Sequence, residues 1–379
     1  MNIAFITTYN SRDVYQWSGA GAYIAMSLEQ QQLKMDRIQL QPPPQFLVHA
    51  ARLKHFPSYA FSKRPMLWRS PSILRFYSRQ VAAFCHTKED QLLFSPGSPV
   101  FSYYDGTCPY AFWVDATYAA MLDYYPDYMN VSRTGIKNGH QAEHAALARC
   151  SAAIYASQWA AESAIKDYKA DPARVHVVPF GANTVWQFSA EDIQQAIKHR
   201  GQTPLRLLFA GVDWERKGGP TAVAAAEHIL ASGQQVQLDI VGCTPPSPLP
   251  DFCRVHGFLS KKSPSERARL TELFVHAHFL IHPAHAEAYG LVCAEASSVG
   301  VPAIVRATGG LPTVVRHSLN GFCLPPDAGP EAFAHTILSA FHPSSYETLC
   351  RSSYREYQQR LNWDVAGAAV ARILEGIIL

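Results

Sequence analysis

The hydrophobic positions of this chain fall into two alternating patterns. Short runs rich in branched and aromatic residues predict strands, and most are bounded by turn residues such as Gly, Pro or Ser. These predicted strands are Asn2–Thr8, Arg37–Leu40, Gln91–Gly97, Tyr110–Thr117, Ala152–Ser157, Val175–Gly181, Leu205–Gly211, Gln237–Gly242, Arg254–Phe258, His278–His282, Val301–Val305 and Gly321–Leu324. Between them, apolar residues recur with the spacing of one helix face. The predicted helices are 21–33, 72–84, 139–150, 218–232, 264–276, 288–299, 330–341 and 363–379.

The order of these elements predicts the class of fold. Strands that alternate with helices pair in parallel through right-handed crossovers, which leaves helices on both faces of the sheet. The alternation restarts at Leu205, after a polar, glutamine-rich segment at 191–202. We therefore expect an α/β protein with two facing Rossmann-like, doubly wound domains, 1–182 and 183–362, joined by a hinge near 181–204. Ligands of open α/β sheets bind beyond the carboxyl ends of the strands, so the cleft between the domains is the expected site.

Composition supports folded domains and excludes several classes of protein. Hydrophobic residues make up 48% of the 379 residues and charged residues 17%, which favours large cores and argues against disorder. The net charge of +3 is too small to make the whole molecule a nucleic-acid binder. The sequence contains no apolar run long enough to cross a membrane, and residues 1–9 are typical of a strand and not of a signal peptide.

The cysteines indicate a reducing compartment. All eight are scattered along the chain without a Cys-x-x-Cys pair, which is too sparse for a disulfide scaffold. Reduced thiols are the simplest interpretation, so we expect a cytoplasmic protein whose membrane contact, if any, is peripheral and at the inner face.

A glycine-containing loop separates the first predicted strand from its helix. Gly19 and Gly21 would let the backbone approach a ligand closely, and free N–H groups at the helix start favour an anionic or hydroxyl-rich partner. Ile24 stands where the third glycine of a dinucleotide fingerprint would fall, so a nicotinamide cofactor is not expected. A tight turn that needs glycine for its shape explains the loop equally well.

The clearest candidate chemistry lies in the second half of the chain. Gly211 ends a predicted strand and a helix begins at Gly218, so Arg216 and Lys217 lie where a parallel strand ends. Two adjacent cations at this edge of a sheet indicate a site for a diphosphate.

Two glutamates, Glu287 and Glu295, bracket a predicted helix start that has Gly290 in its first turn. On one continuous helix, this spacing places them about 12 Å apart along the axis and about 80° apart around it. The two carboxylates therefore cannot share one proton or one metal ion. Each contacts a different part of one elongated ligand, or the two are unrelated.

Taken together, these motifs resemble those of retaining glycosyltransferases of family 4, which have the GT-B fold of two facing Rossmann-like domains. The resemblance covers nearly the whole chain and is strongest from Glu287 to Glu295, where seven residues separate the glutamates and the motif ends in Glu-Ala. The other matching segments are Lys217–Gly218, Ile240–Gly242, Gly300–Pro302, Gly309–Gly310 and Asn320–Gly321, in the order and spacing of the family.

The resemblance implies roles for the candidate residues. Glu287 would contact the donor sugar near the reacting carbon, Glu295 would hold the ribose hydroxyls, and Lys217 would neutralise the diphosphate. The other residues assigned to donor binding are Gly211, Gly290, Leu291 and His285, and an acceptor or donor loop would contain Gly19 and Gly21. The second domain would hold the donor and the first the acceptor, with the last helix, 363–379, packed back on the first domain.

The chain departs from the family pattern at three places. Val212 stands where many members have an arginine, so Arg216 is assigned in its place, and Thr313 stands where a glutamate often follows the Gly-Gly-x-Pro segment. The first-domain histidine that many relatives place near the reacting carbon is not evident. Asp115, at the end of a predicted strand, would face the acceptor hydroxyl instead, or would serve only as a helix cap or loop anchor.

The expected function is sugar transfer, of the hexosyltransferase type, from a nucleotide-diphosphate sugar to a glycan, lipid-linked or small-molecule hydroxyl, with retention of configuration. Cleavage builds negative charge on the diphosphate, which fixed cations and helix N–H groups stabilise. The chain contains no Asp-x-Asp pair, so we expect neither a divalent metal nor another cofactor. The alternatives are a non-catalytic nucleotide-sugar binding protein on the same fold and, less favoured, an epimerase or phosphorylase.

Two histidine patterns indicate other chemistry. The segment from His140 to His144 matches the inverted zinc-protease motif, with Glu143 as its acid. A second, dense group could bind a metal and consists of His276, His278, His282 and His285. We favour helix packing for the first pattern, because no other feature of the sequence indicates a protease, and packing or substrate contact for the second.

Residues 37–88 form a basic stretch, with nine Lys and Arg residues and no acidic residue. Trp68, Phe76 and Tyr77 are interspersed among the cations. A basic, aromatic surface suits an anionic acceptor, a membrane that carries a lipid-linked sugar or, less favoured, RNA, and we expect no nucleic-acid partner. An ordinary solvated face is the other interpretation.

Overall fold

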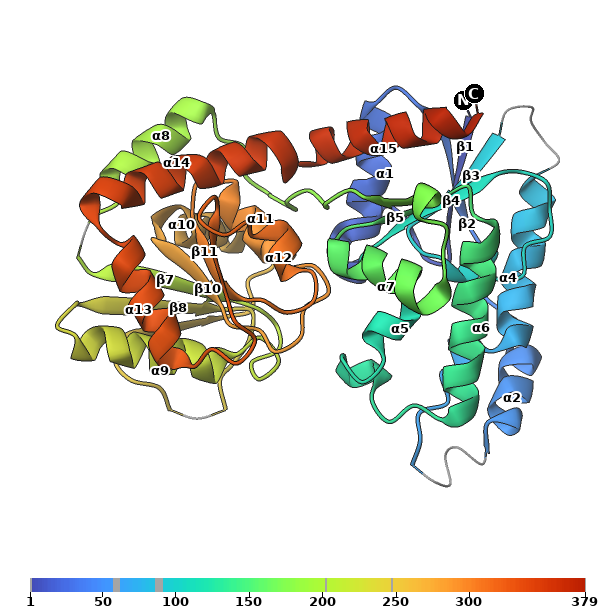
Figure 1. The fold of residues 1–379 in the computed structure, drawn as a ribbon, viewed down its shortest axis with the longest axis horizontal. Helices are drawn as coiled ribbons and strands as arrows, with labels where there is room; N and C mark the ends of the chain where they lie inside the picture. Colours follow the sequence, from blue (N-terminus) through green and yellow to red (C-terminus); the bar gives the residue numbers. More distant parts are fainter. Residues whose placement is uncertain (1, 57–61, 86–90, 202, 247, 379) are drawn as a thin grey trace. The chain divides into compact units, whose positions relative to one another are not determined.

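The computed structural model describes residues 2–56, 62–85, 91–201, 203–246 and 248–378. The chain divides into two compact units, Met1–Pro179 with Ala366–Leu379 and Phe180–Val365. Each unit is an α/β structure built on one parallel sheet (Figure 1). The chain thus passes between the units at 179/180 and at 365/366.

The first unit contains a six-stranded parallel sheet in the order β2-β1-β3-β4-β5-β6. Its strands are β1 (Asn2–Thr7), β2 (Lys34–Gln39), β3 (Gln91–Ser95), β4 (Tyr110–Val114), β5 (Ala152–Tyr155) and β6 (Val175–Val177). All residues of β3 and β5 are buried, as expected for central strands of a parallel sheet that helices cover. The winding direction reverses between β1 and β3, which places the switch point of this sheet at their carboxyl ends.

The helices of the first unit include the last helix of the chain, whose first three residues belong to the second unit. They are α1 (Ala20–Gln30), α2 (Gln45–Lys54), α4 (Pro71–Phe84), α5 (Tyr118–Met121), α6 (Arg133–Arg149), α7 (Gln158–Tyr168) and α15 (Trp363–Ile378). Short 3₁₀ turns are η1 (Gln16–Gly19), η2 (Leu67–Arg69), η3 (Pro99–Phe101), η4 (Pro126–Tyr128) and η5 (Pro172–Arg174). Helix α15 lies beside α1 (Figure 1), where a Cβ on Gly367 would come within 2.5 Å of the Ser27 carbonyl oxygen. Glycine therefore permits this close packing.

The second unit contains a six-stranded parallel sheet in the order β12-β11-β10-β7-β8-β9. Its strands are β7 (Leu205–Ala210), β8 (Val236–Val241), β9 (Cys253–Gly257), β10 (Phe279–His282), β11 (Ala303–Arg306) and β12 (Gly321–Leu324). Its helices are α8 (Ala190–His199), α9 (Gly219–Ala231), α10 (Pro264–His276), α11 (Leu291–Ser297), α12 (Leu311–Val314), α13 (Pro330–Ala340) and α14 (Pro343–Arg360). This is the strand order of the Rossmann dinucleotide-binding sheet, and the switch point lies between β7 and β10.

The predicted fold class is confirmed, and each predicted strand is present, although the strand predicted at Val175–Gly181 ends already at Val177. The interpretation of 191–202 as a polar linker is wrong, because α8 occupies most of it. Ser189 caps this helix: its hydroxyl accepts from the Asp192 N–H, and the Asp192 carboxylate accepts from the Ser189 N–H. Ile193 and Ile197 are buried on one face and hold an otherwise polar helix against the unit.

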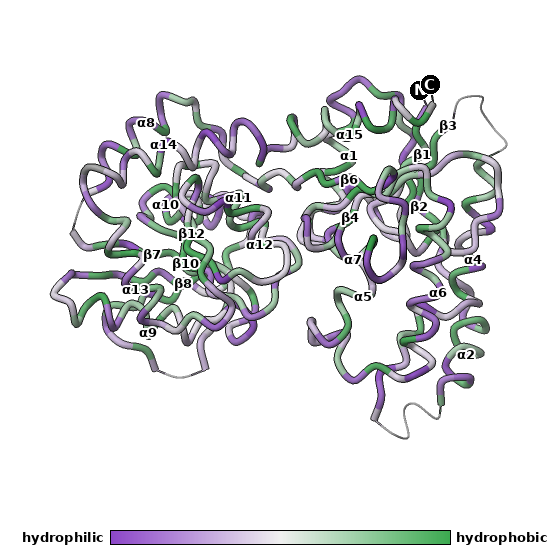
Figure 2. Tube along the Cα trace, in the orientation of Figure 1, coloured by the Kyte–Doolittle hydropathy of each residue, from purple (hydrophilic) through white to green (hydrophobic). Residues whose placement is uncertain are grey.

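The core of each unit lies at its sheet. Figure 2 shows hydrophobic residues concentrated along the strands and hydrophilic residues on the surrounding loops and outer helix turns. Phe5 and Phe94 stack in the first sheet with ring centroids 6.0 Å apart, and Phe209 and Phe279 are fully buried in the second. The strands are therefore fixed by packing, which also fixes the positions of the polar residues that follow their carboxyl ends.

The expectation of reduced thiols is wrong for one pair of cysteines. Cys85, at the end of α4, and Cys108, in the loop before β4, form a disulfide with Cα atoms 5.8 Å apart. The cysteine argument for a reducing compartment therefore does not hold, and the cytoplasmic location stays a prediction. In the part of the chain that the structure describes, no helix is long and apolar enough to span a bilayer.

Candidate functional site

Two loops meet at the switch point of the second sheet. One, at 211–218, leads from β7 into α9, and the other, at 283–290, leads from β10 into α11. Strands β7 and β10 are paired neighbours, so their carboxyl ends bring both loops to the same edge. The His285 N–H donates to the Arg216 carbonyl oxygen at 2.8 Å and ties the loops together.

Glycines permit the close approach of the segments around this edge. Gly218 has a φ of +80°, and a Cβ there would lie 2.2 Å from the Pro283 carbonyl oxygen. Gly242, after β8, has a φ of +96°, and its Cβ would lie 2.8 Å from the Gly211 carbonyl oxygen. At Gly211 a Cβ would press on the Lys217 side chain at 2.9 Å. The predicted site residue Gly211 thus makes room for Lys217.

We expect Gly218→Ala to lower the free energy of unfolding by about 2–4 kcal/mol, because it adds a backbone clash to an unfavourable left-handed conformation. Gly233→Ala is the matched control: Gly233 has a φ of +92° but nothing within 4 Å of a Cβ. The control substitution should lower the free energy of unfolding by only about 1 kcal/mol. Denaturant unfolding measures both, and equal losses in the two variants would contradict the role assigned to close loop packing.

Lys217 and Glu287 form an ion pair between the two loops, in which the lysine Nζ contacts Oε2 of the carboxylate. His282 Nε2, at the end of β10, lies 3.1 Å from the same oxygen. Burial alone would raise the pKa of Glu287, but the charge of Lys217 and the hydrogen bond from His282 outweigh it and hold the pKa well below its usual range. Burial lowers the pKa of His282, so a neutral imidazole donates to an ionised carboxylate.

Arg216, the second predicted diphosphate cation, contacts both loops. Its Nε lies 3.3 Å from Asp213 Oδ2, and its Nη1 donates to the Ala286 carbonyl oxygen at 2.9 Å. The structure therefore places Arg216 beside the residue that precedes Glu287, with part of its guanidinium used in protein contacts. The His285 side chain is exposed next to them, and its contact with the donor stays a prediction.

Glu295 pairs with a lysine that the sequence analysis did not identify. Lys261 Nζ lies 2.8 Å from Glu295 Oε1 and also donates to the Asn183 carbonyl oxygen at 2.8 Å. Lys261 lies in the loop between β9 and α10, at the same edge of the sheet. Glu287 and Glu295 thus each have a cation of their own.

The segment between the two glutamates differs from the predicted helix. Helix α11 begins only at Leu291, so Glu287 lies in the preceding loop and the separation calculated for one continuous helix does not apply. Gly290 caps the helix with a φ of +98°, and a Cβ there would lie 2.6 Å from Leu311 Cδ2. The Glu287 carbonyl oxygen accepts from the Gly310 N–H at 3.1 Å, so the Gly309–Gly310 segment holds the backbone of this glutamate.

The remaining predicted site residues lie in the first unit. Asp115 directly follows β4 and is half-buried, and its role toward an acceptor stays a prediction. Gly19 caps α1 with a φ of +85°. Beside it, the space that a Gly21 side chain would need is filled by Tyr9, whose hydroxyl oxygen would lie 2.0 Å from a Cβ. The turn and packing explain both glycines, and their contact with a ligand stays a prediction.

The zinc-protease motif does not form a metal site. The Glu143 carboxylate is buried, with Oε2 lying 3.1 Å from Arg69 Nη1 and accepting from the Ser98 hydroxyl at 3.0 Å. His140 Nδ1 lies 2.9 Å from the Tyr168 hydroxyl oxygen. The described residues contain no group of His, Cys, Asp and Glu that could hold a metal ion. In the second histidine group, His278 bonds to backbone and His282 to Glu287.

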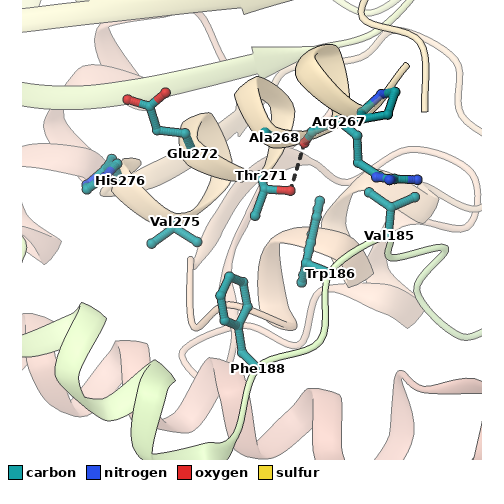
Figure 3. Close-up of a pocket in the computed structure, with 10 residues that line it drawn as sticks. Val185, Trp186, Phe188, Arg267, Ala268, Thr271, Glu272, Val275 and His276 are labelled. Atoms are coloured by element: carbon teal, nitrogen blue, oxygen red, sulfur yellow. Dashed lines mark hydrogen bonds between the residues drawn. The ribbon is translucent and has the colours of Figure 1, made fainter. Parts of the chain in front are cut away.

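A separate pocket of about 420 Å³ lies beside α10 (Figure 3). Trp186 and Phe188, from the segment before α8, face this helix, and Glu272 and His276 lie along it. None of the residues predicted to bind the donor or the acceptor lines the pocket, although His276 of the second histidine group does. Glu272 and His276 are exposed, so the pocket lacks the buried, paired charges found at the β7 and β10 loops.

The architecture is that of the GT-B glycosyltransferases. Sucrose-phosphate synthase from Thermosynechococcus elongatus has a similar fold, with a TM-score of 0.69 and 18% identity, over 99% of this chain and 98% of that chain. Anabaena HepE in complex with UDP-glucose gives a TM-score of 0.60 and 16% identity, over 99% and 100% of the two chains. The predicted GT-B fold is therefore confirmed.

Residues 190–358 match the family model of glycosyl transferases group 1. A D-inositol 3-phosphate glycosyltransferase of Xylanimonas cellulosilytica is 30% identical over 243 residues, which are 60% of this chain and 57% of that relative. The chain spans about half the length of the curated relatives it matches. The glycosyltransferase resemblance is thus confirmed, whereas membership of family 4 stays a prediction.

Proposed function

We propose that this protein transfers a sugar from a nucleotide-diphosphate sugar to an acceptor hydroxyl, with the donor held by the β7 and β10 loops. The observation that carries the proposal is the meeting of Lys217, Glu287 and His282 at the switch point of a Rossmann-ordered sheet. A diphosphate suits a cation at this edge, and sugar hydroxyls suit an ionised carboxylate. The family of residues 190–358 supports this function, as does the UDP-glucose complex of HepE.

The charges at the site support a role for each group in bond cleavage. As the bond between the anomeric carbon and the diphosphate oxygen breaks, negative charge grows on the diphosphate. Lys217 and Arg216 stabilise this charge more strongly in the transition state than in the ground state, without a divalent metal. Glu287, kept ionised by its neighbours, opposes the positive charge that grows at the anomeric carbon.

The acceptor completes the reaction on the face of the sugar from which the diphosphate leaves. Its oxygen forms the new bond to the anomeric carbon, its proton passes to a diphosphate oxygen, and the nucleoside diphosphate departs. The configuration is therefore retained. Following the family resemblance, we assign the ribose to Glu295 and the acceptor to the first unit at Asp115, in the synthesis of a polysaccharide or glycoconjugate.

Two measurements on the full chain test this function. Thermal unfolding with a panel of nucleotide-diphosphate sugars identifies the donor, because a bound ligand raises the melting temperature. Release of nucleoside diphosphate, with and without acceptor sugars, then measures transfer and hydrolysis, and the anomer of the product reports retention. Saturable binding with neither transfer nor hydrolysis would favour the non-catalytic sugar-nucleotide binding protein instead. Failure to bind any donor would refute the assigned site.

We expect Lys261→Met to raise the donor KM roughly tenfold with a smaller change in kcat, because Glu295 loses the charged hydrogen bond that orients it. Lys262→Met is the matched control, since Lys262 is adjacent and exposed. The ratio of the KM for a 2′-deoxyribose donor to the KM for the ribose donor should be smaller in the Lys261 variant than in the unmodified protein, and unchanged in the Lys262 variant. An unchanged KM and unchanged discrimination would remove Lys261 from the donor site.

A further inference from the structure

An exposed apolar strip runs along α2 in the first unit. Phe46 and Leu53 are 73% and 74% exposed, and Phe56, just beyond the helix, is 65% exposed. Phe46 and Leu53 are seven residues apart and so point in nearly the same direction, with the exposed Ala50 between them. Ala51, on the opposite side, is buried against the unit. The strip therefore faces solvent while another face of the same helix forms the packing contact.

Two cations flank this apolar strip. Arg52 and Lys54 adjoin Leu53 in the sequence and lie about 100° to either side of it around the helix axis. Both are exposed, and neither has an ion-pair partner among the residues that the structure describes. The helix carries no acidic residue, so its outer surface has an apolar centre with positive charge on both sides.

Elsewhere in the basic stretch, acidic partners neutralise several cations. Arg37 pairs with Glu29 at 2.6 Å, and Arg64 with Asp127 at 3.1 Å. Arg69 is buried against Glu143, and Lys88 lies outside the described residues. Lys63, Arg75 and Arg79 are exposed, but α4, which carries the two arginines, exposes no large apolar residue. Among the described helices of this stretch, α2 therefore combines exposed cations with large exposed apolar residues.

We propose that α2 docks the first unit on an anionic lipid surface. The helix lies in the plane of the interface, with Phe46 and Leu53 at the boundary between headgroups and acyl chains. Arg52 and Lys54 extend to lipid phosphates on either side of the strip, as long basic side chains do at such boundaries. A membrane surface presents phosphates on both sides of an inserted apolar strip, and so it matches the cations on both flanks of α2. This charge complementarity favours a membrane over a protein groove as the partner. This inference does not depend on the proposed sugar transfer.

Co-sedimentation of the full chain with lipid vesicles tests the proposal, without a donor present. We expect binding to vesicles of phosphatidylcholine and phosphatidylglycerol, weakened by added salt, and little binding to phosphatidylcholine alone. The double variant F46S/L53S should bind at least about tenfold more weakly. The variant R52Q/K54Q should also bind about tenfold more weakly and should lose most of the salt dependence.

Matched controls lie in the second unit. Leu230→Ser changes an exposed leucine of α9, and Lys198→Gln an exposed lysine of α8, and neither should alter vesicle binding. Unchanged melting temperatures would show that all variants fold. Equal vesicle binding by F46S/L53S and the unmodified chain would overturn the proposal, as would equal binding to neutral and anionic vesicles. If F46S/L53S instead abolished a dimer in solution and left vesicle binding intact, a second copy would be the occupant and the lipid proposal would be wrong.

Discussion

Glu287→Gln should reduce sugar transfer at least about a hundredfold while the donor KM changes far less, because the variant loses a charge needed chiefly in the transition state. The amide that replaces the carboxylate has nearly the same shape and can still accept from Lys217 and His282. The melting temperature should therefore stay close to that of the unmodified protein. Steady-state release of nucleoside diphosphate, with the donor varied, measures both kinetic constants.

The control for this variant is Glu227→Gln, an exposed glutamate on α9 in the same unit. It makes the same chemical change outside the two loops and should leave kcat and KM unaltered. Transfer by Glu287→Gln at more than about a tenth of the normal rate would exclude Glu287 from the reacting centre. A large loss of melting temperature would instead show that its charge is needed for folding.

Lys217→Met should weaken donor binding and also destabilise the second unit by about 3–5 kcal/mol. The first effect follows from the loss of a cation beside the diphosphate, and the second from leaving the buried Glu287 carboxylate without its ion-pair partner. Thermal shift with the donor measures the former, and denaturant unfolding the latter. Lys198→Met, an exposed lysine of α8, is the control and should change neither.

The pH dependence of stability distinguishes this ion pair from simple packing. In the unmodified protein the pKa of Glu287 lies below its ordinary value of 4.5, so its contribution is fully present above that pH and is lost as the pH falls further. Without Lys217, burial pushes the pKa of Glu287 upward. The variant should therefore be most destabilised near neutral pH, and the difference should shrink toward acid pH as the carboxyl takes up a proton.

A double variant separates the two roles of Lys217. Lys217→Met with Glu287→Gln removes both charges, so the buried-charge penalty disappears and the free energy of unfolding should recover most of its loss. Sugar transfer should not recover, because both groups act on the donor. Recovery of transfer in the double variant would show that Lys217 serves only to neutralise Glu287.

The strands could be predicted because helices cover both faces of each sheet, which leaves nearly continuous apolar runs such as β7 and β10. Helix α8 could not, since its pattern is mostly polar and only Ile193 and Ile197 anchor it. The disulfide could not be predicted either, because no local pattern indicates it. Cys85 and Cys108 are brought together by tertiary packing and have no diagnostic spacing.

The candidate site likewise contains residues that the sequence could predict and residues that only the folded structure identifies. Lys217 and Glu287 could be predicted because each lies in a loop that follows a strand, and the Rossmann order makes those two strands neighbours. Lys261 could not, because an identical residue stands beside it and loop conformation decides which of them meets Glu295. Tyr9 was missed because nothing in the sequence shows that its ring fills the space beside Gly21.

The second unit is an insertion in the first, since the chain leaves the first unit after Pro179 and returns at Ala366. Its two ends are joined: the Ala182 N–H donates to the Leu361 carbonyl oxygen at 2.9 Å, and the Trp363 indole donates to Asn183 Oδ1 at 2.8 Å. A segment whose entry and exit meet can be excised and grafted without stretching the host. If the second unit holds the donor as proposed, recombination at these two points would exchange the whole donor-binding unit at once, and a new donor could reach an old acceptor in one evolutionary step.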